Sequence, residues 1–315
     1  MSILGSPSVL ASTPVTRPGP LDLARGVLRS TRPGQWPKNL LVAAAPLAGA
    51  TLGRPEVPVG LALTFVALTL TSGGLYLFND AMDIERDRAH PTKCRRPVAA
   101  GLIPRSWALV LSAFFVVAGL AVALAPDHTG RAGMVVAGYA VITIAYSRWL
   151  KRVPVLEMVA VASGFVLRAV AGALATRTPP SLWFLVVAAG GALAVTVAKR
   201  GIELSGLGPR ALVHRPVLAA YSVRGLRRAR VALLVLTLGA YAGWVLTRHG
   251  TWVRGMDLAS LVPLAIALVR FDVLAGRAST DPSGIAVEHL IVHDRPMRWA
   301  ELTWVVLFLA GLLVG

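Results

Sequence analysis

Residues 57–88 read VPVGLALTFVALTLTSGGLYLFNDAMDIERDR, an apolar run that ends in a cluster of charged side chains. The apolar part, 57–78, is long enough to cross a bilayer as one helix, which takes about 20 residues. Gly, Ala and Thr are frequent in it, as they are in helices that pack closely in lipid. The stretch therefore predicts a transmembrane helix with a polar end at the membrane surface.

Similar apolar runs recur along the rest of the 315-residue chain. Hydrophobic residues make up 55% of the chain and charged residues 15%, whereas a typical soluble domain is about 25% charged. This composition excludes a disordered chain and argues against a water-soluble enzyme. The runs also lack the ten-residue alternation of a transmembrane β-strand. We therefore predict an all-α polytopic membrane helical bundle with nine transmembrane helices, at about 39–53, 57–78, 106–125, 130–147, 153–176, 181–198, 229–247, 252–271 and 299–315.

The segments outside these runs complete the expected organisation. Residues 1–20 are rich in Pro, Ser and Thr and lack the features of a secretory signal, so they predict a disordered tail. Residues 21–32 predict either a short amphipathic surface helix or a basic flank of the first span. We expect 21–315 to form a single integral-membrane domain with long loops at 79–105, 199–228 and 272–298.

The distribution of positive charge predicts the orientation. Of the 32 Lys and Arg residues, 26 lie in the tail and in the loops after the even-numbered spans, and only 5 lie in the other loops. By the positive-inside rule the N-terminus and the three long loops are cytoplasmic, and the C-terminus is outside. The formal net charge of +17 favours anionic headgroups or phosphorylated substrates. A nucleic-acid partner is not expected, because little soluble surface remains to carry a basic patch.

The acidic motif Asn79-Asp80-x-x-Asp83-x-x-x-Asp87 is the most informative part of the chain. On a continuous helix these four residues share an arc of about 100°, and Glu85 points away. Three carboxylates on one stripe repel one another, and a Mg²⁺ ion bound together with substrate phosphate oxygens would relieve that repulsion. The alternative is a solvated helix end that binds nothing.

Basic residues follow directly. Pro91 disfavours helix at the preceding residue, so the acidic helix is expected to end there. Lys93, Arg95 and Arg96 would then fold back near the carboxylates and bind phosphate. The alternative is a positively charged membrane anchor. Cys94 is the only cysteine, which excludes an intrachain disulfide and a cysteine-based zinc cluster.

A second motif, Lys199-Arg200-x-x-Glu203, repeats the angular spacing of the first with mostly basic residues. Facing the acidic stripe across a cavity, it could hold phosphate oxygens; the alternative is again a membrane-end anchor. Other polar residues near the same end could also face that cavity. They are Gln35, Lys38, Asn39, Tyr146, Lys151, Glu157 and Arg168. Glu157 and Arg168 lie on one inner face of the fifth expected span, too far apart along its axis to pair.

At these residues the chain resembles the UbiA superfamily of membrane prenyltransferases, which are nine-helix bundles with an Asn-Asp-x-x-Asp motif that binds Mg²⁺ and diphosphate. Within it, the chain is most similar to the bacterial decaprenyl-phosphate phosphoribosyltransferases. The matching strings are Arg32-Pro33, Gln35-Trp36, Lys38-Asn39, Asn79–Asp87, His90–Lys93, Arg96-Pro97, Ala100-Gly101, Ala145–Ser147, Leu167–Ala169, Ala171-Gly172, Lys199-Arg200 and Glu203-Leu204. They cover the first two thirds of the chain, and the last third matches only loosely.

The resemblance implies a transfer of 5-phosphoribose from phosphoribosyl pyrophosphate to a polyprenyl phosphate such as decaprenyl phosphate. Pyrophosphate would leave, and the product would serve arabinose-donor and cell-wall synthesis at a bacterial plasma membrane. Asp80, Asp83 and Asp87 would bind Mg²⁺, and Asp80, Asp83, Lys199 and Arg200 would be catalytic. The substrate-binding residues would be Gln35, Lys38, Asn79, Lys93, Arg96, Tyr146, Lys151, Arg168 and Glu203.

Two alternatives stay open at this stage. The first is an ordinary UbiA-type enzyme, in which a prenyl diphosphate is the donor and an aromatic compound or another lipid is the acceptor. Such enzymes generally carry carboxylates in both motifs, and Lys199 and Arg200 argue against it. The second is a transporter of phosphorylated lipids, which is disfavoured because the chain has no internal repeat. Small residues on many helix faces would permit a homo-oligomer without specifying one.

Overall fold

The computed structural model describes residues 19–90, 92–126, 129–206, 215–247, 251–280 and 292–314. Within these ranges the fold is all-helical, as predicted. The expected disordered tail falls almost wholly outside the described residues. The helices are α1 (Pro20–Ser30), η1 (Pro33–Ala43), α2 (Ala44–Ala48), α3 (Val57–Met82), α4 (Ile84–Arg88), η2 (Lys93–Arg95), α5 (Arg105–Leu124), α6 (Arg131–Arg148), η3 (Leu150–Arg152), α7 (Leu156–Ala175), α8 (Leu182–Gly206), η4 (Pro216–Ala220), α10 (Val223–Thr247), α11 (Thr251–Thr280) and α13 (Arg295–Val314).

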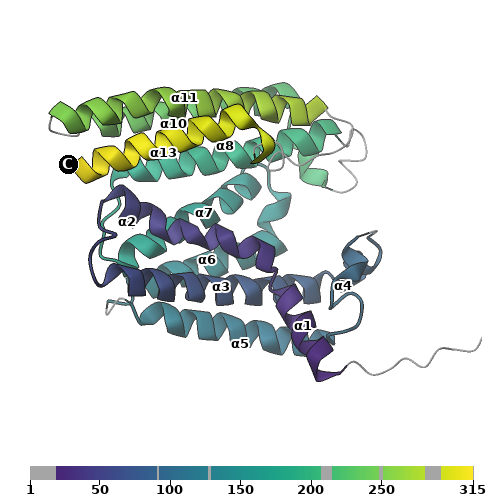
Figure 1. Cartoon of the computed structure of the whole chain (residues 1–315). Coiled ribbons are helices and arrows are strands. Elements are labelled where there is room, and N and C mark those ends of the chain that lie inside the picture. Colours follow the sequence, from purple (N-terminus) through teal and green to yellow (C-terminus); the bar gives the residue numbers. More distant parts are fainter. Residues whose placement is uncertain are drawn as a thin grey trace, which may run out of the picture.

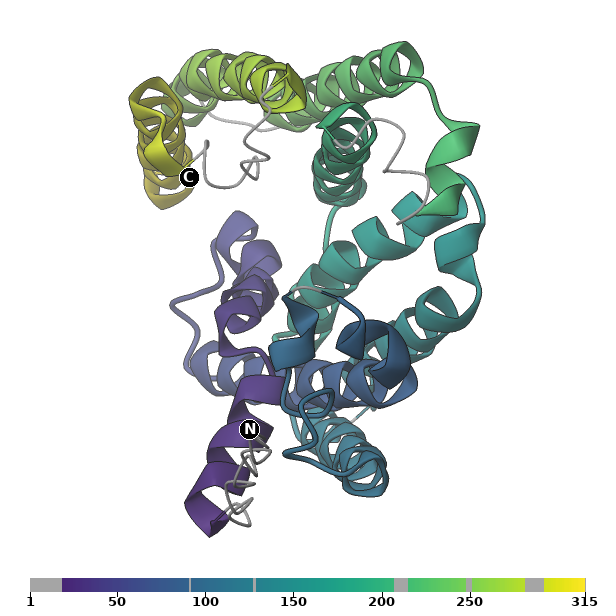
Figure 2. The ribbon, with the colours of Figure 1, turned by 90° about the vertical axis from the view of Figure 1, so that its right-hand side faces the viewer.

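The long helices lie side by side, with their axes roughly aligned (Figure 1). Seen along these axes, they follow one another around an open ring, with α13 beside the first segments of the chain (Figure 2). Leu47 and Ala48 of α2 pack against a buried cluster that includes Tyr241 of α10 and Phe308 of α13. This contact joins the last helices to the first ones.

The outer surface of the bundle is apolar, as a membrane protein requires. Large hydrophobic side chains are exposed on α5, α6, α10 and α11, among them Phe114, Val141, Val235 and Val269. In the described part of the chain, six helices are long and apolar enough to cross a bilayer: α3, α5, α7, α8, α10 and the Gly255–Ser279 part of α11. The multi-pass membrane fold is thus confirmed. The other three expected spans fall on η1 with α2, on α6 and on α13, so the count of nine stays a prediction.

The first expected span differs from its predicted limits. The helical segment begins at Pro33 and ends at Ala48 rather than covering 39–53, and its first part is a 3₁₀ helix. Pro37 lies inside this part and removes a backbone donor. Its backbone also lies directly against α7, because a Cβ atom on Gly172 would overlap the carbonyl oxygen of Val42. The limits 39–53 were therefore wrong, since Pro37 and the contact at Gly172 shape this segment more than hydropathy does.

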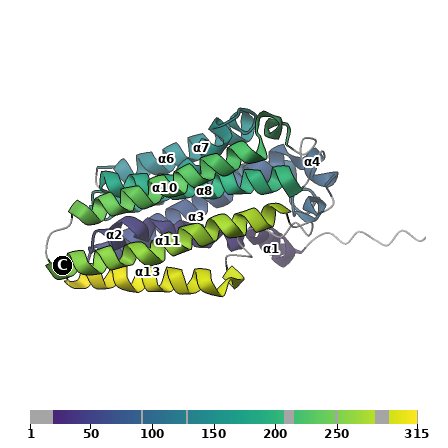
Figure 3. The same cartoon turned by 90° about the horizontal axis from the view of Figure 1, so that it is seen from above.

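The described parts of the three long loops gather at one end of the bundle, which we call the loop end. There α3 leads into α4, α8 ends near η4, and α13 begins, whereas α2 and the end of α13 lie at the opposite end (Figures 1 and 3). Helix α1 also lies at the loop end. The charge pattern predicted that the three long loops lie on the same side of the membrane, and this arrangement agrees with that prediction.

Candidate functional site

The acidic motif lies at the loop end of α3. Helix α3 ends at Met82, Asp83 has non-helical backbone angles (φ −105°, ψ 16°), and α4 begins at Ile84. The unbroken helix expected from the sequence is therefore interrupted at Asp83. The Asp83 N–H donates to the Asn79 carbonyl and the Asp87 N–H donates to the Asp83 carbonyl, both at 2.9 Å. Asp80 and Asp87 nevertheless lie close together, because both carboxylates accept from the same nitrogen of Arg96. Glu85 is exposed, as predicted.

Two arginines neutralise this face, and together with the two aspartates they form what we call the aspartate cluster (Arg32, Asp80, Asp87 and Arg96). Nη1 of Arg96 donates to Oδ1 of Asp80 at 3.1 Å and to Oδ2 of Asp87 at 2.8 Å. Nη2 of Arg32 donates to the same Oδ1 of Asp80 at 2.6 Å. The side chains of Asp80 and Asp87 are only 2% and 5% exposed, so these charges are paired in a desolvated place.

The loop after α4 folds back as predicted and delivers Arg96. The Ala100 N–H donates to the Arg96 carbonyl at 2.8 Å, and Nε of Arg88 donates to the Ala99 carbonyl at 3.1 Å. Val98 and Ile103 are buried against the ends of α3 and α5. The backbone of the loop is thus fixed by packing. Lys93 and Arg95, which were also predicted to bind phosphate, lie exposed on η2, and of the three basic residues it is Arg96 that contacts the aspartates.

Asp83 points to a different neighbour. Its carboxylate lies 3.6 Å from Nη1 of Arg86 and 4.0 Å from Nζ of Lys151, which extends from η3. Within the described ranges, no three Asp, Glu, His or Cys side chains come close enough together to hold a metal ion. Asp83 and Asn79 as site residues therefore stay predictions. Lys151 does lie beside the acidic motif.

Asp80 and Asp87 nonetheless fit a Mg²⁺ ion. Both present carboxylate oxygens within hydrogen-bond distance of a single nitrogen atom of Arg96, so a cation already lies between them. Mg²⁺ prefers oxygen ligands and is usually bound by one or two carboxylates together with phosphate oxygens. These two aspartates supply that number, provided that a substrate supplies the rest.

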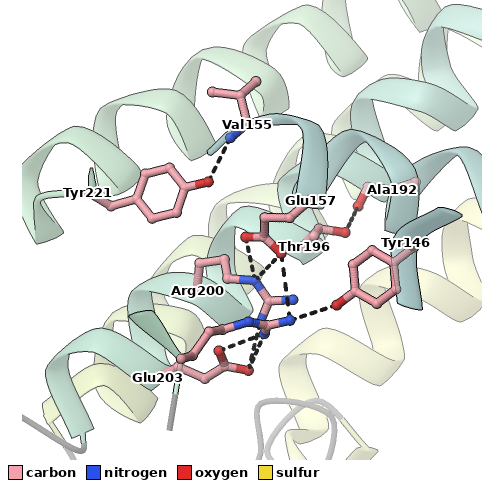
Figure 4. Close-up of polar contacts among 9 residues, drawn as sticks. Tyr146, Val155, Glu157, Ala192, Thr196, Arg200, Glu203 and Tyr221 are labelled. Atoms are coloured by element: carbon pink, nitrogen blue, oxygen red, sulfur yellow. Dashed lines mark hydrogen bonds and ion pairs between the residues drawn. The ribbon is translucent and has the colours of Figure 1, made fainter. Parts of the chain in front are cut away.

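The basic motif on α8 forms a second buried network, the glutamate–arginine cluster (Tyr146, Glu157, Arg200, Glu203 and Arg215; Figure 4). Nε of Arg200 donates to both carboxylate oxygens of Glu157, at 2.8 and 3.0 Å, and Nη1 donates to Glu203 at 2.6 Å. Glu157 is completely buried. Arg200 thus binds two glutamates of its own chain. Lys199, beside it, is half-buried.

Arg215 closes this network from the loop that follows α8. Its Nη1 donates to Oε2 of Glu203 at 3.0 Å, and its Nη2 donates to the Tyr146 hydroxyl at 2.6 Å (Figure 4). Burial by itself would lower the pKa of Arg215, but Tyr146, Glu203 and Glu157 raise it above its ordinary value. The guanidinium therefore stays charged. The two glutamates and two arginines of the cluster have no net charge.

A strained turn places Glu157. Val155 has a positive φ of 66° with ψ −51°, and the Leu156 N–H donates to the Pro154 carbonyl at 2.8 Å. These are the features of a γ-turn with positive φ, which is rare and costly for a β-branched residue. The Val155 N–H donates to the Tyr221 hydroxyl at 2.7 Å (Figure 4). Burial raises the pKa of Tyr221, so the hydroxyl remains protonated at neutral pH.

Arg168 lies deeper, among helices. It donates to Asn39 at 2.8 Å, to the Tyr139 hydroxyl at 2.9 Å and to the Gly164 carbonyl at 2.6 Å. As predicted, it does not pair with Glu157, whose partners are Arg200 and Arg215. Arg168 links η1 to α6 and α7, and its role in substrate binding stays a prediction. On η1, Gln35 is half-buried and Lys38 is exposed.

The end of α6 and η3 touch both the second cluster and the acidic motif. Tyr146 at the end of α6 contacts Arg215, and Lys151 in η3 contacts Asp83. Sequence reasoning missed two members of the site, Arg32 and Arg215. Arg32 belongs to the Arg32-Pro33 string that matches the family. It was not assigned to the site, because a positive charge beside the first expected span is also typical of a membrane anchor. Arg215 carried no local signal, because its partners are distant in the sequence.

An apolar cavity of about 300 Å³ lies beside α8, between α10, α11 and α13. Its lining includes Gly191, Leu234, Phe271 and Met297, with Glu301 as the ionisable side chain among the lining residues. A cavity of this character suits an apolar chain. It extends along the same helix that carries Arg200.

Comparison with known proteins places these features in a family. The UbiA prenyltransferase family matches residues 40–283. Proteins named decaprenyl-phosphate phosphoribosyltransferase are similar over nearly the whole chain. The one from Mycobacterium tuberculosis is 34% identical (96% of this chain, 98% of that protein), and the one from Corynebacterium glutamicum is 33% identical (92% and 87%).

Solved structures share the fold. A UbiA homologue from Archaeoglobus fulgidus, bound to DMAPP and Mg²⁺, superposes with a TM-score of 0.68 at 17% identity, over 92% of this chain and 98% of that one. A digeranylgeranylglyceryl phosphate synthase gives a TM-score of 0.66 at 14% identity, over 93% and 100%. At such identities the likeness concerns the arrangement of the helices alone.

Proposed function

The chain belongs to the UbiA prenyltransferase family and is a membrane transferase; from that premise we propose that it moves 5-phosphoribose from phosphoribosyl pyrophosphate to a polyprenyl phosphate. The observation that carries the proposal is the identity of 33–34% to proteins named decaprenyl-phosphate phosphoribosyltransferase, over more than nine tenths of this chain. The expected product is a polyprenyl-phosphoryl ribose 5-phosphate, and pyrophosphate leaves.

The aspartate cluster suits the donor. Breaking the bond between C1 and the pyrophosphate oxygen develops positive charge on the ribose ring and negative charge on pyrophosphate. A bound Mg²⁺ would supply Lewis-acid stabilisation of the leaving group. Asp80 and Asp87 would hold the ion, and Arg32 and Arg96 lie beside them to bind phosphate oxygens.

The acceptor needs positioning rather than deprotonation. A polyprenyl phosphate is already an anion, and one of its oxygens can attack C1 without a general base. Two anionic substrates repel each other, so cations are needed where they meet. Lys151 is partly exposed and lies at the corner between the two clusters, which suits this role. Arg200, buried on its glutamates, would position Glu203 and Arg215.

The rest of the substrate would lie in the bundle. The isoprenoid chain suits the apolar cavity beside α8, where Leu234 and Phe271 are among the lining residues. The excess of Lys and Arg in the three long loops favours a cytoplasmic loop end, at a bacterial plasma membrane. A polyprenyl-linked ribose phosphate there would serve arabinose-donor and cell-wall synthesis.

The experiment is a comparison of donors. Purified protein in lipid nanodiscs is incubated with Mg²⁺, decaprenyl phosphate and phosphoribosyl pyrophosphate, and lipid products are identified by mass spectrometry. We expect a decaprenyl-phosphoryl ribose 5-phosphate that forms only when metal is present. A parallel reaction supplies prenyl diphosphate with an aromatic or lipid acceptor. Product in that reaction and none in the first would overturn the proposal in favour of an ordinary prenyl transfer.

A further inference from the structure

The aspartate cluster has a feature that the proposed reaction leaves unexplained: an arginine stands where the metal would bind. A single nitrogen of Arg96 accounts for a hydrogen bond to each of the two carboxylates, at 3.1 Å on Asp80 and 2.8 Å on Asp87. A divalent ion that takes these oxygens as ligands competes with the guanidinium for the same lone pairs and repels it. Metal binding to both aspartates therefore requires Arg96 to leave.

The structure allows that movement in the side chain alone. The side chain of Arg96 is 29% exposed, whereas the two carboxylates are almost completely buried. The backbone that carries it is fixed, because the Arg96 N–H donates to the Lys93 carbonyl at 2.9 Å and Val98 is buried. The long side chain can rotate away while the loop stays in place.

Arg96 also needs a new partner once it leaves. A guanidinium removed from two charge-assisted hydrogen bonds loses their energy unless another anion accepts them. A diphosphate offers such oxygens at the place where the metal holds it. Arg32 can remain on Asp80, since its guanidinium also stacks on the ring of Tyr76, 4.5 Å from its centroid.

We propose that Arg96 exchanges partners during substrate binding: it joins Asp80 to Asp87 before the ligands bind and moves to a diphosphate oxygen when metal and diphosphate enter. The proposal rests on the proposed function, whose diphosphate donor it uses. Its consequence is that neither the metal nor the diphosphate binds well alone. Each tightens the other by the same factor, because binding coupling is reciprocal.

The test measures binding, with no turnover. Mn²⁺ is the metal probe, followed by electron paramagnetic resonance, and pyrophosphate is the diphosphate probe, followed by calorimetry. Each is titrated into the full-length protein in nanodiscs, alone and with the other present. For the unmodified chain we expect each dissociation constant to fall at least about tenfold when the other ligand is present.

Arg96→Gln separates the two roles of the side chain. We expect Mn²⁺ without pyrophosphate to bind about tenfold more tightly than in the unmodified chain, because its competitor is gone. Pyrophosphate with Mn²⁺ should bind about tenfold more weakly, because its partner is gone. Arg96→Lys keeps the positive charge but not the planar fork, so only the second change should appear. The matched control is Arg95→Gln, which removes the same charge from the neighbouring exposed position.

The direction in which Arg96→Gln changes the Mn²⁺ affinity decides whether the exchange occurs. The exchange does not occur if Arg96→Gln weakens Mn²⁺ binding in the absence of pyrophosphate. The same conclusion follows if Arg96→Gln and Arg95→Gln bind Mn²⁺ with equal affinity. If the unmodified chain binds the two probes independently, the exchange is also wrong. These results are separate from the product experiment, because pyrophosphate is common to both candidate donors. Failure of phosphoribosyl transfer alone leaves the binding measurements unaffected.

Discussion

The two charged clusters at the loop end come from motifs of similar spacing in the sequence but have different surroundings in the structure. Each contains part of a motif with residues at positions i, i+1 and i+4 near the end of a long helix: 79, 80 and 83 where α3 ends, and 199, 200 and 203 on α8. In the aspartate cluster the arginines come from outside the motif and are about 30% exposed. In the glutamate–arginine cluster, Arg200 is 6% exposed and binds the completely buried Glu157 together with the partly exposed Glu203.

This difference separates an exchangeable site from a permanent one. Partly exposed arginines can leave the aspartates when a substrate offers better partners. If Arg200 and Glu157 separated, the completely buried Glu157 carboxylate would keep only its 3.7 Å contact with Arg215, which costs several kcal/mol. We therefore expect substitutions in the first cluster to act mainly on activity, and substitutions in the second to act mainly on stability.

The largest expected effect is on Asp80. Asp80→Asn removes a carboxylate charge that the donor site requires, so turnover should fall by about a thousandfold or more. The measurement is transfer from radiolabelled phosphoribosyl pyrophosphate, with the thermal unfolding midpoint as a check on folding. Glu85→Gln is the matched control, since it removes a carboxylate from the same motif at an exposed position. Near-normal turnover of Asp80→Asn would remove Asp80 from the site.

Glu157 tests the other side of the comparison. Glu157→Gln leaves Arg200 without its completely buried carboxylate, and we expect a loss of about 3 kcal/mol of stability. Thermal and chemical unfolding in detergent measure it. The double variant Glu157→Gln with Arg200→Met should recover part of the loss, because no unpaired charge remains. A stable Glu157→Gln protein without activity would show that both clusters are functional sites. The distinction between an exchangeable cluster and a permanent one would then be wrong.

Lys151 lies between the clusters and should show an intermediate effect. Lys151→Gln removes a cation that lies next to Asp83 and, in the proposed reaction, next to the acceptor phosphate. The value of kcat/KM for the polyprenyl phosphate should therefore fall about tenfold. The neighbouring exposed residue provides the control, Arg152→Gln. Equal effects of the two variants would mean that only general positive charge at this surface matters.

The turn before Glu157 predicts a gain in stability. Val155→Gly relieves the positive φ of a β-branched residue and should stabilise the protein by about 1 kcal/mol if the turn keeps its shape. Unfolding measurements on this variant and on Val153→Gly, which lies just outside the turn, provide the comparison. A loss of stability at both positions would show that Val155 is not strained in solution.

The smallest expected effect concerns the apolar cavity beside α8, the helix that also carries Arg200. A Cβ atom at Gly191 would meet open space, so Gly191→Leu fills the cavity without a clash. We expect the KM for decaprenyl phosphate to rise about threefold, with little change for a short-chain polyprenyl phosphate. The control is Gly239→Leu on α10, which also points into open space but is exposed. Equal KM values for both variants would place the lipid tail elsewhere.

Local patterns predicted much of this structure. The exposure of Glu85 follows from helix periodicity, and the return of Arg96 to the acidic motif follows from Pro91 and the charge of the loop. The spacing of Glu157 and Arg168 correctly excluded a direct pair. These inferences hold because they depend on neighbours within a few turns of one helix.

Long-range partners could not be predicted in the same way. The pairing of Glu157 with Arg200 joins two helices, and Arg215 reaches Tyr146 across 69 positions of sequence. The interruption at Asp83 and the shifted limits of the first segment were also missed. The limits of the first segment reflect Pro37 and its close contact with α7, whereas Asp83 lies beside Lys151 of η3. Hydropathy describes the lipid-facing surface, and it contains little information about such internal contacts.

The contact between Gly172 and Val42 limits how this sequence can evolve. Two backbones touch there without a side chain between them, so even alanine would force α7 and the 3₁₀ segment apart. That displacement would carry Asn39 away from Arg168. A saturation library at codon 172 should therefore return glycine alone among active clones, although the position lies far from any reacting atom.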